Sequence, residues 1–356
     1  MKNETEILKQ EAIALLRHLI TLPSFSKDEW QTASAITKFL SGKGVQVTRV
    51  GNNVLALNKF FDSSKPTILL NSHHDTVRPN SNYTRDPFDG KIEDGKLYGL
   101  GSNDAGGCLV ALMMTFLHYY ETDSLQYNLA YAATAEEEIS GAGGIENALK
   151  FLPPIDCAIV GEPTLMQMAI AEKGLVVLDC TARGKAGHAA RNEGENAIYK
   201  AVKDIEWISN HHFEKVSDLL GPVKMSVTVI ETDNKAHNVV PAQCKFVIDV
   251  RVNEQYTLEE VVETIKKNIN SDVTPRSLRI RSSSISLQHP LVRSGISLGL
   301  TYYGSPTTSD KALMPFPALK IGPGDSARSH MANEYIYLEE VKNGIEIYIN
   351  LLGKIL

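Results

Sequence analysis

Residues 127–141, YNLAYAATAEEEISG, are the stretch of sequence that decides the fold. They begin with an apolar run at 129–133, which has the character of a buried strand, and they end with three consecutive acids, Glu136, Glu137 and Glu138. Adjacent carboxylates repel one another and unpaired charge is costly to bury, so this strand end must hold a cation or tolerate raised pKa values. The alternative is an ordinary solvated loop.

Three further apolar runs are also followed by residue types that bind metal ions. They are 68–70 before His73-His74-Asp75, 159–160 before Glu162, and 319–321 before a Gly-rich segment and His330. Because ligands collect at strand ends in an open α/β sheet, we expect these residues to gather at such ends. A glycine-rich loop at 99–107 adds Asp104 at the mouth of a predicted helix. Together these patterns favour a metal site over a solvated loop.

The length and composition indicate a two-domain enzyme. A chain of 356 residues is too long for one comfortable hydrophobic core. The content of 43% apolar and 22% charged residues is typical of soluble globular enzymes. With a net charge of −6 and no dominant basic patch, the composition argues against a nucleic-acid partner.

Cysteine usage and the N-terminal sequence predict the cellular compartment. The four cysteines are widely spaced without a C-x-x-C pair, which favours reduced, buried thiols over disulfides. Residues 1–6 lack the apolar core of a signal peptide, and no apolar run approaches membrane-spanning length. We therefore expect a soluble, cytoplasmic protein without a membrane partner.

The sequence periodicity predicts an α/β domain interrupted by a domain of another kind. After residue 174 the order is strand, helix, strand, strand, helix, strand, at 175–183, 196–211, 225–231, 244–252, 258–268 and 278–285. This order predicts a ferredoxin-like α+β domain inserted at residues 175–287. Residues 1–174 and 288–356 then form one discontinuous domain with a mixed central sheet flanked by helices.

The candidate metal ligands are two imidazoles and three carboxylates: His73, Asp104, Glu138, Glu162 and His330. This set matches the donors of paired Zn²⁺ ions, with one histidine and one terminal carboxylate for each ion and a third carboxylate as the bridge. A single zinc ion would leave too many acids without a countercharge. We therefore expect two zinc ions, for which cobalt can substitute.

Seven short motifs occur along the chain. They are HHDTV at 73–77, GSNDAGG at 101–107, EEE at 136–138, GEPT at 161–164, Gly187-His188, NVVP at 238–241, and His330 followed by Asn333-Glu334-Tyr335. In this order they resemble the motifs of the dinuclear zinc deacylase and carboxypeptidase superfamily, which includes acetylornithine deacetylase, succinyl-diaminopimelate desuccinylase and aminoacylase. Each motif is weak alone, but the combination is specific and covers the whole chain.

The resemblance implies a role for each candidate ligand. His73, Asp104 and Glu162 would bind one zinc ion. Asp104, Glu138 and His330 would bind the other, which makes Asp104 the bridging carboxylate. The resemblance also implies a zinc-peptidase-like catalytic domain and an inserted domain that serves as a lid and dimerises.

Two further acids have implied catalytic roles. Glu137 resembles the general base, which stands beside a ligand, takes a proton from water and returns it to the leaving amine. Asp75 would support His73, because two residues later on an extended strand it lies on the same side and can accept the imidazole N–H. The alternative for Glu137 is a surface acid.

The inserted domain contributes three candidate residues. His188 resembles the histidine that reaches across a dimer to polarise the scissile carbonyl, which implies a homodimer. Arg251 and Asn238 resemble residues that hold the substrate carboxylate, and bidentate pairing suits arginine to this task. The alternatives are a surface or packing histidine and an ordinary surface salt bridge.

The sequence departs from the family pattern at four positions without losing a ligand. Ser72 replaces the usual glycine before the H-x-D motif, and His74 creates an ambiguity of register that the motif spacing resolves in favour of His73. Glu136 replaces aspartate and Ser140 replaces glycine, and both changes bear on the shape of the loop.

The resemblance implies a zinc-dependent amidohydrolase that removes the N-acyl group from a small amino acid. N-acetylornithine or N-succinylornithine, in arginine biosynthesis, is the expected substrate, on the resemblance of the GEPT motif and of Gly322-Pro323-Gly324 to the deacetylase branch. The alternatives on the same scaffold are a succinyl-diaminopimelate desuccinylase and a dipeptidase or carboxypeptidase. A catalytically silent metal-binding protein is a further alternative, against which the retained base and ligands argue.

Overall fold

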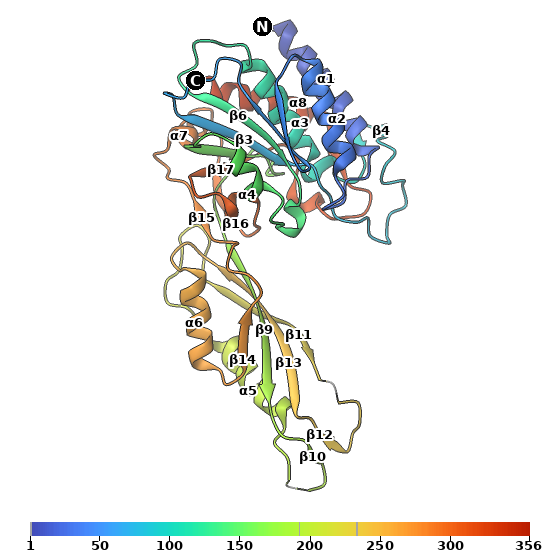
Figure 1. Ribbon diagram of the computed structural model, residues 1–356, viewed down its shortest axis with the longest axis vertical. Coiled ribbons are helices and arrows are strands. Elements are labelled where there is room, and N and C mark those ends of the chain that lie inside the picture. The colour runs from blue at the N-terminus through green and yellow to red at the C-terminus, as the bar shows by residue number, and fades with distance from the viewer. Residues whose placement is uncertain (1, 192, 233) are drawn as a thin grey trace. The chain divides into compact units, whose positions relative to one another are not determined.

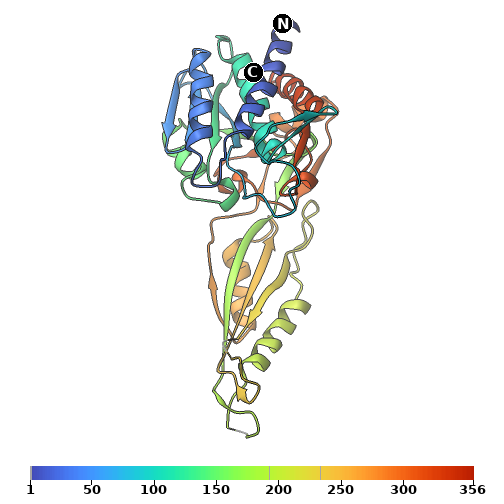
Figure 2. The ribbon, with the colours of Figure 1, turned by 90° about the vertical axis from the view of Figure 1, so that its right-hand side faces the viewer.

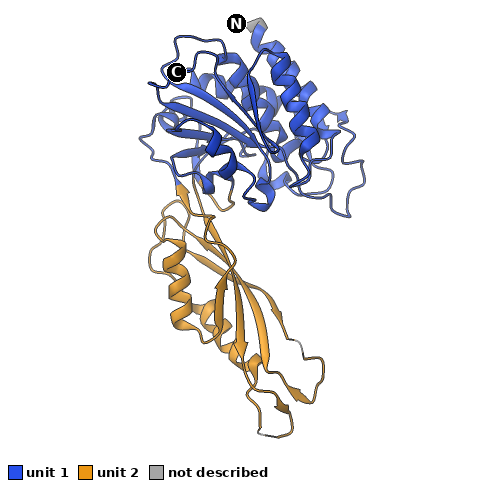
Figure 3. Cartoon of the chain, in the orientation of Figure 1, with its two compact units in different colours: residues 1–170, 284–303, 309–356 blue, residues 171–283, 304–308 orange. Residues whose placement is uncertain are grey.

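The computed structural model describes residues 2–191, 193–232 and 234–356, which form two compact units (Figure 3). Unit 1 comprises residues 1–170, 284–303 and 309–356, and unit 2 comprises residues 171–283 and 304–308. Met1, the first residue of the N-terminal stretch considered above, lies outside the described residues. The sequence pattern predicted an insertion at 175–287, without any signal that residues 304–308 join unit 2.

The main sheet is mixed and has the strand order β1-β2-β6-β3-β7-β17-β8-β15, with β16 paired to β8 (Figure 1). These strands are β1 (Val47–Val50), β2 (Asn53–Leu57), β3 (Thr67–His73), β6 (Asn128–Thr134), β7 (Cys157–Val160), β8 (Met168–Glu172), β15 (Ser283–Ser284), β16 (Tyr302–Ser305) and β17 (Ala318–Lys320). A smaller sheet contains β4 (Ile92–Glu93), β5 (Lys96–Tyr98) and β18 (Tyr335–Tyr337).

Helices flank the main sheet (Figures 1 and 2). They are α1 (Lys2–Ile20), α2 (Trp30–Gly42), α3 (Gly107–Tyr119), α4 (Ile145–Ala148), α7 (Pro290–Ser297) and α8 (Leu338–Leu352), with short helical turns η1 (Ser102–Gly106), η2 (Glu137–Ile139), η3 (Leu149–Phe151), η4 (Asp310–Leu313) and η5 (Ser326–Arg328). Alternate residues of β3 face opposite sides of the sheet. Ile68 and Leu70 join the core formed with α1, α2, α3 and α8, whereas Leu69 joins a smaller core with α4.

Four neighbouring strands, β6, β3, β7 and β17, run parallel, so their carboxyl ends lie at the same edge of the sheet. His73 and Thr134, the last residues of β3 and β6, are register partners. Val160, the last residue of β7, is the register partner of both Asn71 and Lys320. His73 ends β3, and the segments with Glu138, Glu162 and His330 follow the neighbouring strands β6, β7 and β17, whereas Asp104 lies in the turn before α3.

Unit 2 has the predicted order of elements. They are β9 (Gly174–Arg183), α5 (Ala197–Asn210), β11 (Lys224–Glu231), β13 (Gln243–Val252), α6 (Leu258–Asn268) and β14 (Asp272–Pro275), with β10 (Gly187–His188) paired to β12 (Val239–Val240). The antiparallel sheet order β11-β13-β9-β14 is the ferredoxin-like one. Alternate residues of β9 and β13 pack in one core with residues of α5 and α6.

The last strand of unit 2 was predicted at 278–285, and this prediction was wrong. The strand is β14, which ends three residues before that range begins, while Ser283 and Ser284 join the main sheet. β14 is an edge strand with Val273 as its one large apolar residue and with Pro275 at its end, so it lacks the apolar run by which strands are predicted.

The state of the cysteines and the character of the helices were also expected from the sequence. The four cysteines are buried and are free thiols. Within the described ranges, no helix combines the length and the apolar character that crossing a membrane requires.

Candidate metal centre

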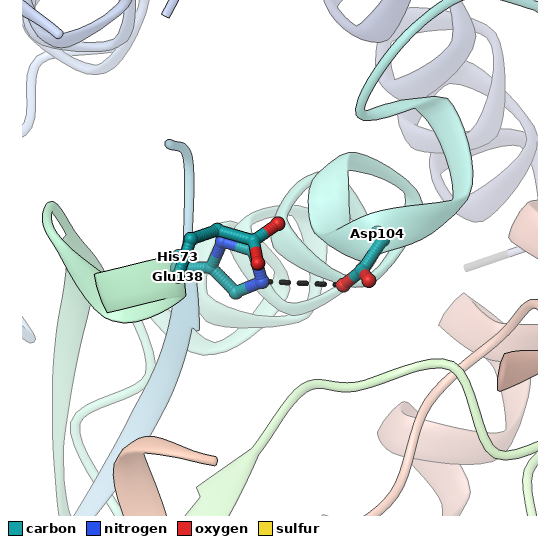
Figure 4. Close-up of side chains that lie close together, drawn as sticks. All are labelled: His73, Asp104 and Glu138. Atoms are coloured by element: carbon teal, nitrogen blue, oxygen red, sulfur yellow. Dashed lines mark ion pairs between the residues drawn. The ribbon is translucent and has the colours of Figure 1, made fainter. Parts of the chain in front are cut away.

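The five predicted ligand side chains converge at the carboxyl edge of the parallel strands in unit 1. Asp104 lies between two histidines, because its Oδ1 is 3.4 Å from His73 Nε2 and its Oδ2 is 3.6 Å from His330 Nε2. Glu162 Oε1 lies 3.8 Å from His73 Nε2, and Glu138 Oε2 lies 2.9 Å from His330 Nε2. Figure 4 shows the contact of His73 with Asp104, with Glu138 beside it. A carboxylate that reaches both imidazoles has the position that a bridging ligand requires.

The donor atoms fall into two groups, each within 4.8 Å. One group is His73, Asp104 and Glu138, and the other is His73, Glu137 and Glu162. His73 therefore belongs to both groups, although the predicted partition assigns it to one ion. Glu137, the predicted base, also lies among the donor atoms. How the ligands divide between two ions remains a prediction.

His73 fits a metal ligand by its chemistry as well as by its position. It is buried, its Nδ1 lies 3.0 Å from the backbone oxygen of Asp75, and its Nε2 makes no hydrogen bond. A neutral ring that donates from Nδ1 keeps a lone pair on Nε2, which is the tautomer that metal binding needs. Burial opposes a charged ring, but Asp104 and Asp75 raise the pKa of His73 well above its ordinary value. A cation would therefore compete with a proton for this nitrogen.

The carboxylate of Asp75 mainly holds the loop that carries the predicted base. It accepts the backbone N–H groups of Glu137 at 3.0 Å and Glu138 at 3.2 Å, and the hydroxyl of Ser26 at 2.7 Å. Its Oδ1 lies 3.5 Å from His73 Nδ1, farther than the backbone oxygen of Asp75 itself. Burial works to raise the pKa of Asp75, but His73, the Ser26 hydroxyl and the N–H of Glu137 hold it below its ordinary value.

Glu137 has surroundings that suit a proton acceptor. Its Oε2 lies 4.0 Å from His73 Nε2. Burial raises the pKa of Glu137 well above its ordinary value, and although His73 opposes this rise, the carboxylates of Glu162, Asp310 and Glu138 add to it. A carboxylate in these surroundings takes up a proton readily, as a general base must.

His330 is the half-exposed member of the cluster. The hydrogen bond with Glu138 is the main reason that the pKa of His330 rises to about 9, and partial burial opposes it. His74, by contrast, points to other partners, with Nδ1 2.9 Å from Thr32 Oγ1 and Nε2 3.0 Å from the backbone oxygen of Asn52. Burial lowers the pKa of His74 to about 4, so it stays neutral. Of the two adjacent histidines, His73 faces the cluster.

Two buried acids that support the site carry no motif by which the sequence could reveal them. Glu29 accepts the backbone N–H of Glu136 at 3.3 Å and the side-chain amide of Asn52 at 2.7 Å. Asp310 accepts the hydroxyl of Thr134 at 2.7 Å, and burial raises the pKa of Asp310 to about 6. Both reach the site from other parts of the chain through the fold alone.

The three candidate residues on the insertion belong to unit 2. His188 is exposed on β10, where its Nδ1 accepts the backbone N–H of Ala190 at 3.1 Å. The backbone oxygen of Asn238 accepts the N–H of Ala189 at 2.9 Å. Arg251 on β13 forms a two-point ion pair with Asp249, at 2.8 and 3.0 Å. Their roles toward a substrate remain predictions.

A mixed α/β unit with a His, Asp and Glu cluster beyond its parallel strands is typical of metal-dependent hydrolases. The chain belongs to peptidase family M20/M25/M40, whose sequence profile matches residues 69–354. Among relatives, a succinyl-diaminopimelate desuccinylase of Cereibacter sphaeroides is 28% identical over 263 residues, which is 69% of each chain. Succinyl-diaminopimelate desuccinylase 2 of Ruegeria sp. is 25% identical and covers 72% of this chain and 69% of its own.

Several solved structures share this fold. The aminopeptidase PepT of Bacillus cereus superposes with a TM-score of 0.78 at 16% identity and covers 98% of each chain. The YXEP protein of Bacillus subtilis, described as a dinuclear metal binding peptidase from the M20 family, has a TM-score of 0.75 at 15% identity, again over 98% of each chain. The M20 metallo-carboxypeptidase Sso-CP2 of Sulfolobus solfataricus has a TM-score of 0.75 at 18% identity, with 97% of this chain covered and 100% of its own.

Metal binding should strengthen with pH. Since the pKa of His330 in the metal-free protein is about 9 and that of His73 is also raised, a cation must displace protons below pH 9. We expect the apparent Zn²⁺ affinity to rise between pH 6.5 and 9, by up to about tenfold per pH unit for each proton displaced. Calorimetric titration in buffers of different ionisation enthalpy measures the released protons. An affinity that does not change over this range would contradict the prediction.

Proposed function

We propose that this protein is a metal-dependent amidohydrolase that removes the N-acyl group from a small amino acid. The observation that carries the proposal is the convergence of His73, Asp104, Glu138, Glu162 and His330 around the predicted base Glu137. Zinc is the proposed metal, because imidazole nitrogen and carboxylate oxygen are its usual donors. Cobalt is the proposed substitute, and the cytoplasm is the proposed location.

Bound divalent ions would supply Lewis acidity toward the scissile carbonyl and lower the pKa of water. In the proposed reaction, Glu137 accepts a proton from the water that adds to the amide carbon. When the C–N bond breaks, Glu137 gives this proton to the leaving nitrogen, so that a carboxylic acid and an amine result, and the acid then loses its remaining proton to the amine. The carboxylate of Asp75 keeps Glu137 in place by accepting the backbone N–H of Glu137.

The names of the relatives support an N-succinyl substrate, and succinyl-diaminopimelate is therefore our first choice. N-acetylornithine and N-succinylornithine, and with them a role in arginine biosynthesis, remain part of the proposal through the motif resemblance. A peptidase is the second candidate, because structural neighbours include a tripeptidase of Staphylococcus aureus, with a TM-score of 0.75 at 20% identity. Arg251 and Asn238 are proposed to hold the substrate carboxylate.

We further propose a homodimer formed through unit 2. Apolar side chains are exposed there on one helix and one strand: Tyr199 (70%) and Val202 (50%) on α5, and Val229 (47%) and Ile230 (53%) on β11. β11 is an edge strand of its sheet, and an exposed apolar edge strand is prone to pair with another chain. His188 of each chain would then serve the site of the other.

Replacing the base should separate metal binding from turnover. Glu137→Gln keeps the size of the side chain but cannot take up a proton, so we expect kcat to fall by about 10²- to 10⁴-fold at an unchanged metal content. Glu146→Gln, on α4, is the matched control and should keep wild-type turnover. Steady-state kinetics and elemental analysis measure the two quantities. Retained activity in the Glu137 variant would show that Glu137 is not the general base.

A substrate panel should identify the acyl group. We expect the highest kcat/KM for succinyl-diaminopimelate among that compound, N-succinylornithine, N-acetylornithine and dipeptides. Release of the free amine measures deacylation, and release of free amino acids measures dipeptide cleavage. A preference for dipeptides would favour a peptidase. A preference for either ornithine derivative would favour a role in arginine biosynthesis.

Mixing two inactive variants should test the role of His188 across a dimer. In a mixed dimer, the His188→Ala chain keeps Glu137 and the Glu137→Gln chain keeps His188. If His188 acts on the other chain, the site of the His188→Ala chain then has both an intact base and an intact histidine. We therefore expect activity to return after the variants are mixed and exchange subunits. If His188 acts on its own chain, neither site is complete and activity stays lost. Light scattering gives the oligomeric state, and a fully active monomer would refute the dimer.

A further inference from the structure

Glu334 belongs to the sequence motif at 330–335, and the proposed reaction assigns it no role. It follows His330 by four residues, and only 1% of its surface is exposed. Its carboxylate accepts three backbone N–H groups from one loop: Gly101 at 3.0 Å on Oε2, and Asn103 at 2.8 Å and Asp104 at 2.9 Å on Oε1. Every one of these partners is a donor, which a carboxylate with two acceptor oxygens matches.

The loop held by Glu334 places the predicted bridging ligand. Asp104 has non-helical backbone angles, φ −117° and ψ 97°, just before α3 begins. Gly101 opens the loop in the left-handed region, with φ 76°. Asn103 and Asp104 lie in the first turn of η1, where backbone N–H groups have no acceptor within the helix, so a side chain must supply one. The direction of the Asp104 carboxylate, which reaches both His73 and His330, follows from this backbone.

The segment that carries Glu334 is itself fixed to the neighbouring loop. The side-chain oxygen of Asn333 accepts the N–H groups of Thr84 at 3.1 Å and Arg85 at 3.0 Å. The side chain of Asn80 donates to the backbone oxygen of His330 at 3.2 Å. One short anchored segment thus presents His330 and holds the backbone of Asp104.

We propose that Glu334 is a positioning residue that sets the Asp104 carboxylate by holding its backbone, and that metal affinity and turnover depend on it through Asp104. The proposal rests on the proposed metal-dependent function. It predicts that Glu334 affects metal affinity in a protein that is already folded, which a purely structural acid does not.

The test compares two variants of Glu334 with a matched acid. Glu334→Gln replaces one acceptor oxygen by an NH₂ donor, so at least one loop N–H loses its partner. We expect its Zn²⁺ affinity to fall by about 10- to 100-fold and kcat to fall while KM changes little. Glu334→Asp keeps the carboxyl group at a shorter reach and should show a smaller loss. Glu340→Gln removes the acid that pairs with Arg328 at 2.6 and 2.9 Å, and should lower thermal stability but keep the wild-type affinity.

The readouts are titration of the metal-free full chain with Zn²⁺, the number of ions bound, and circular dichroism as a check of the fold. Wild-type Zn²⁺ affinity in folded Glu334→Gln would overturn the proposal, as would wild-type affinity in Glu334→Asp if the first variant does not fold. Failure of both variants to fold would make Glu334 a folding residue and also overturn it. A wild type that binds no Zn²⁺ would instead refute the proposed metal-dependent function, and this inference with it.

Discussion

The mutual repulsion of carboxylates at one sheet edge is the constraint on which the rest of the site depends. Asp104, Glu137 and Glu162 each approach His73 Nε2 to 4.0 Å or less. Parallel strands impose part of this crowding, because Glu137 and Glu162 follow β6 and β7, the neighbours of β3, whereas Asp104 comes from η1. The acids raise the pKa of the histidines, and burial and neighbouring acids raise the pKa of Glu137. Divalent cations would relieve the repulsion that the backbone creates.

A second group of buried acids holds the loops that carry the donors. Asp75 accepts backbone N–H groups of Glu137 and Glu138, Glu29 accepts that of Glu136, and Glu334 accepts three in the loop of Asp104. These loops leave regular secondary structure where the ligands begin, so their buried donors need acceptors from side chains. The same hydrogen bonds that satisfy the backbone also fix the direction of the ligands, which links the stability of the loops to the chemistry of the site.

Much of the fold could be predicted because it follows from local patterns. The apolar run of β3, the alternation in β9 and β13, and the order of elements in unit 2 are each visible in short windows of sequence. Local patterns did not reveal β14, since the last strand of unit 2 was predicted at 278–285, nor that residues 304–308 belong to unit 2. An edge strand such as β14 gains its structure from pairing with β9, and its own residues reveal little of it.

By itself, the sequence determined which side chains could bind metal ions and that they follow apolar strands, because residue type and spacing are local properties. Only the tertiary structure decided which acids act as supports. The bond between Glu334 and the backbone of Asp104 joins residues 230 positions apart, and its acceptor could be any buried acid of the right reach. The tertiary structure also decided that Asp75 turns its carboxylate toward the backbone of Glu137 and Glu138. Such contacts leave no periodic trace, since a backbone N–H is the same at every residue except proline.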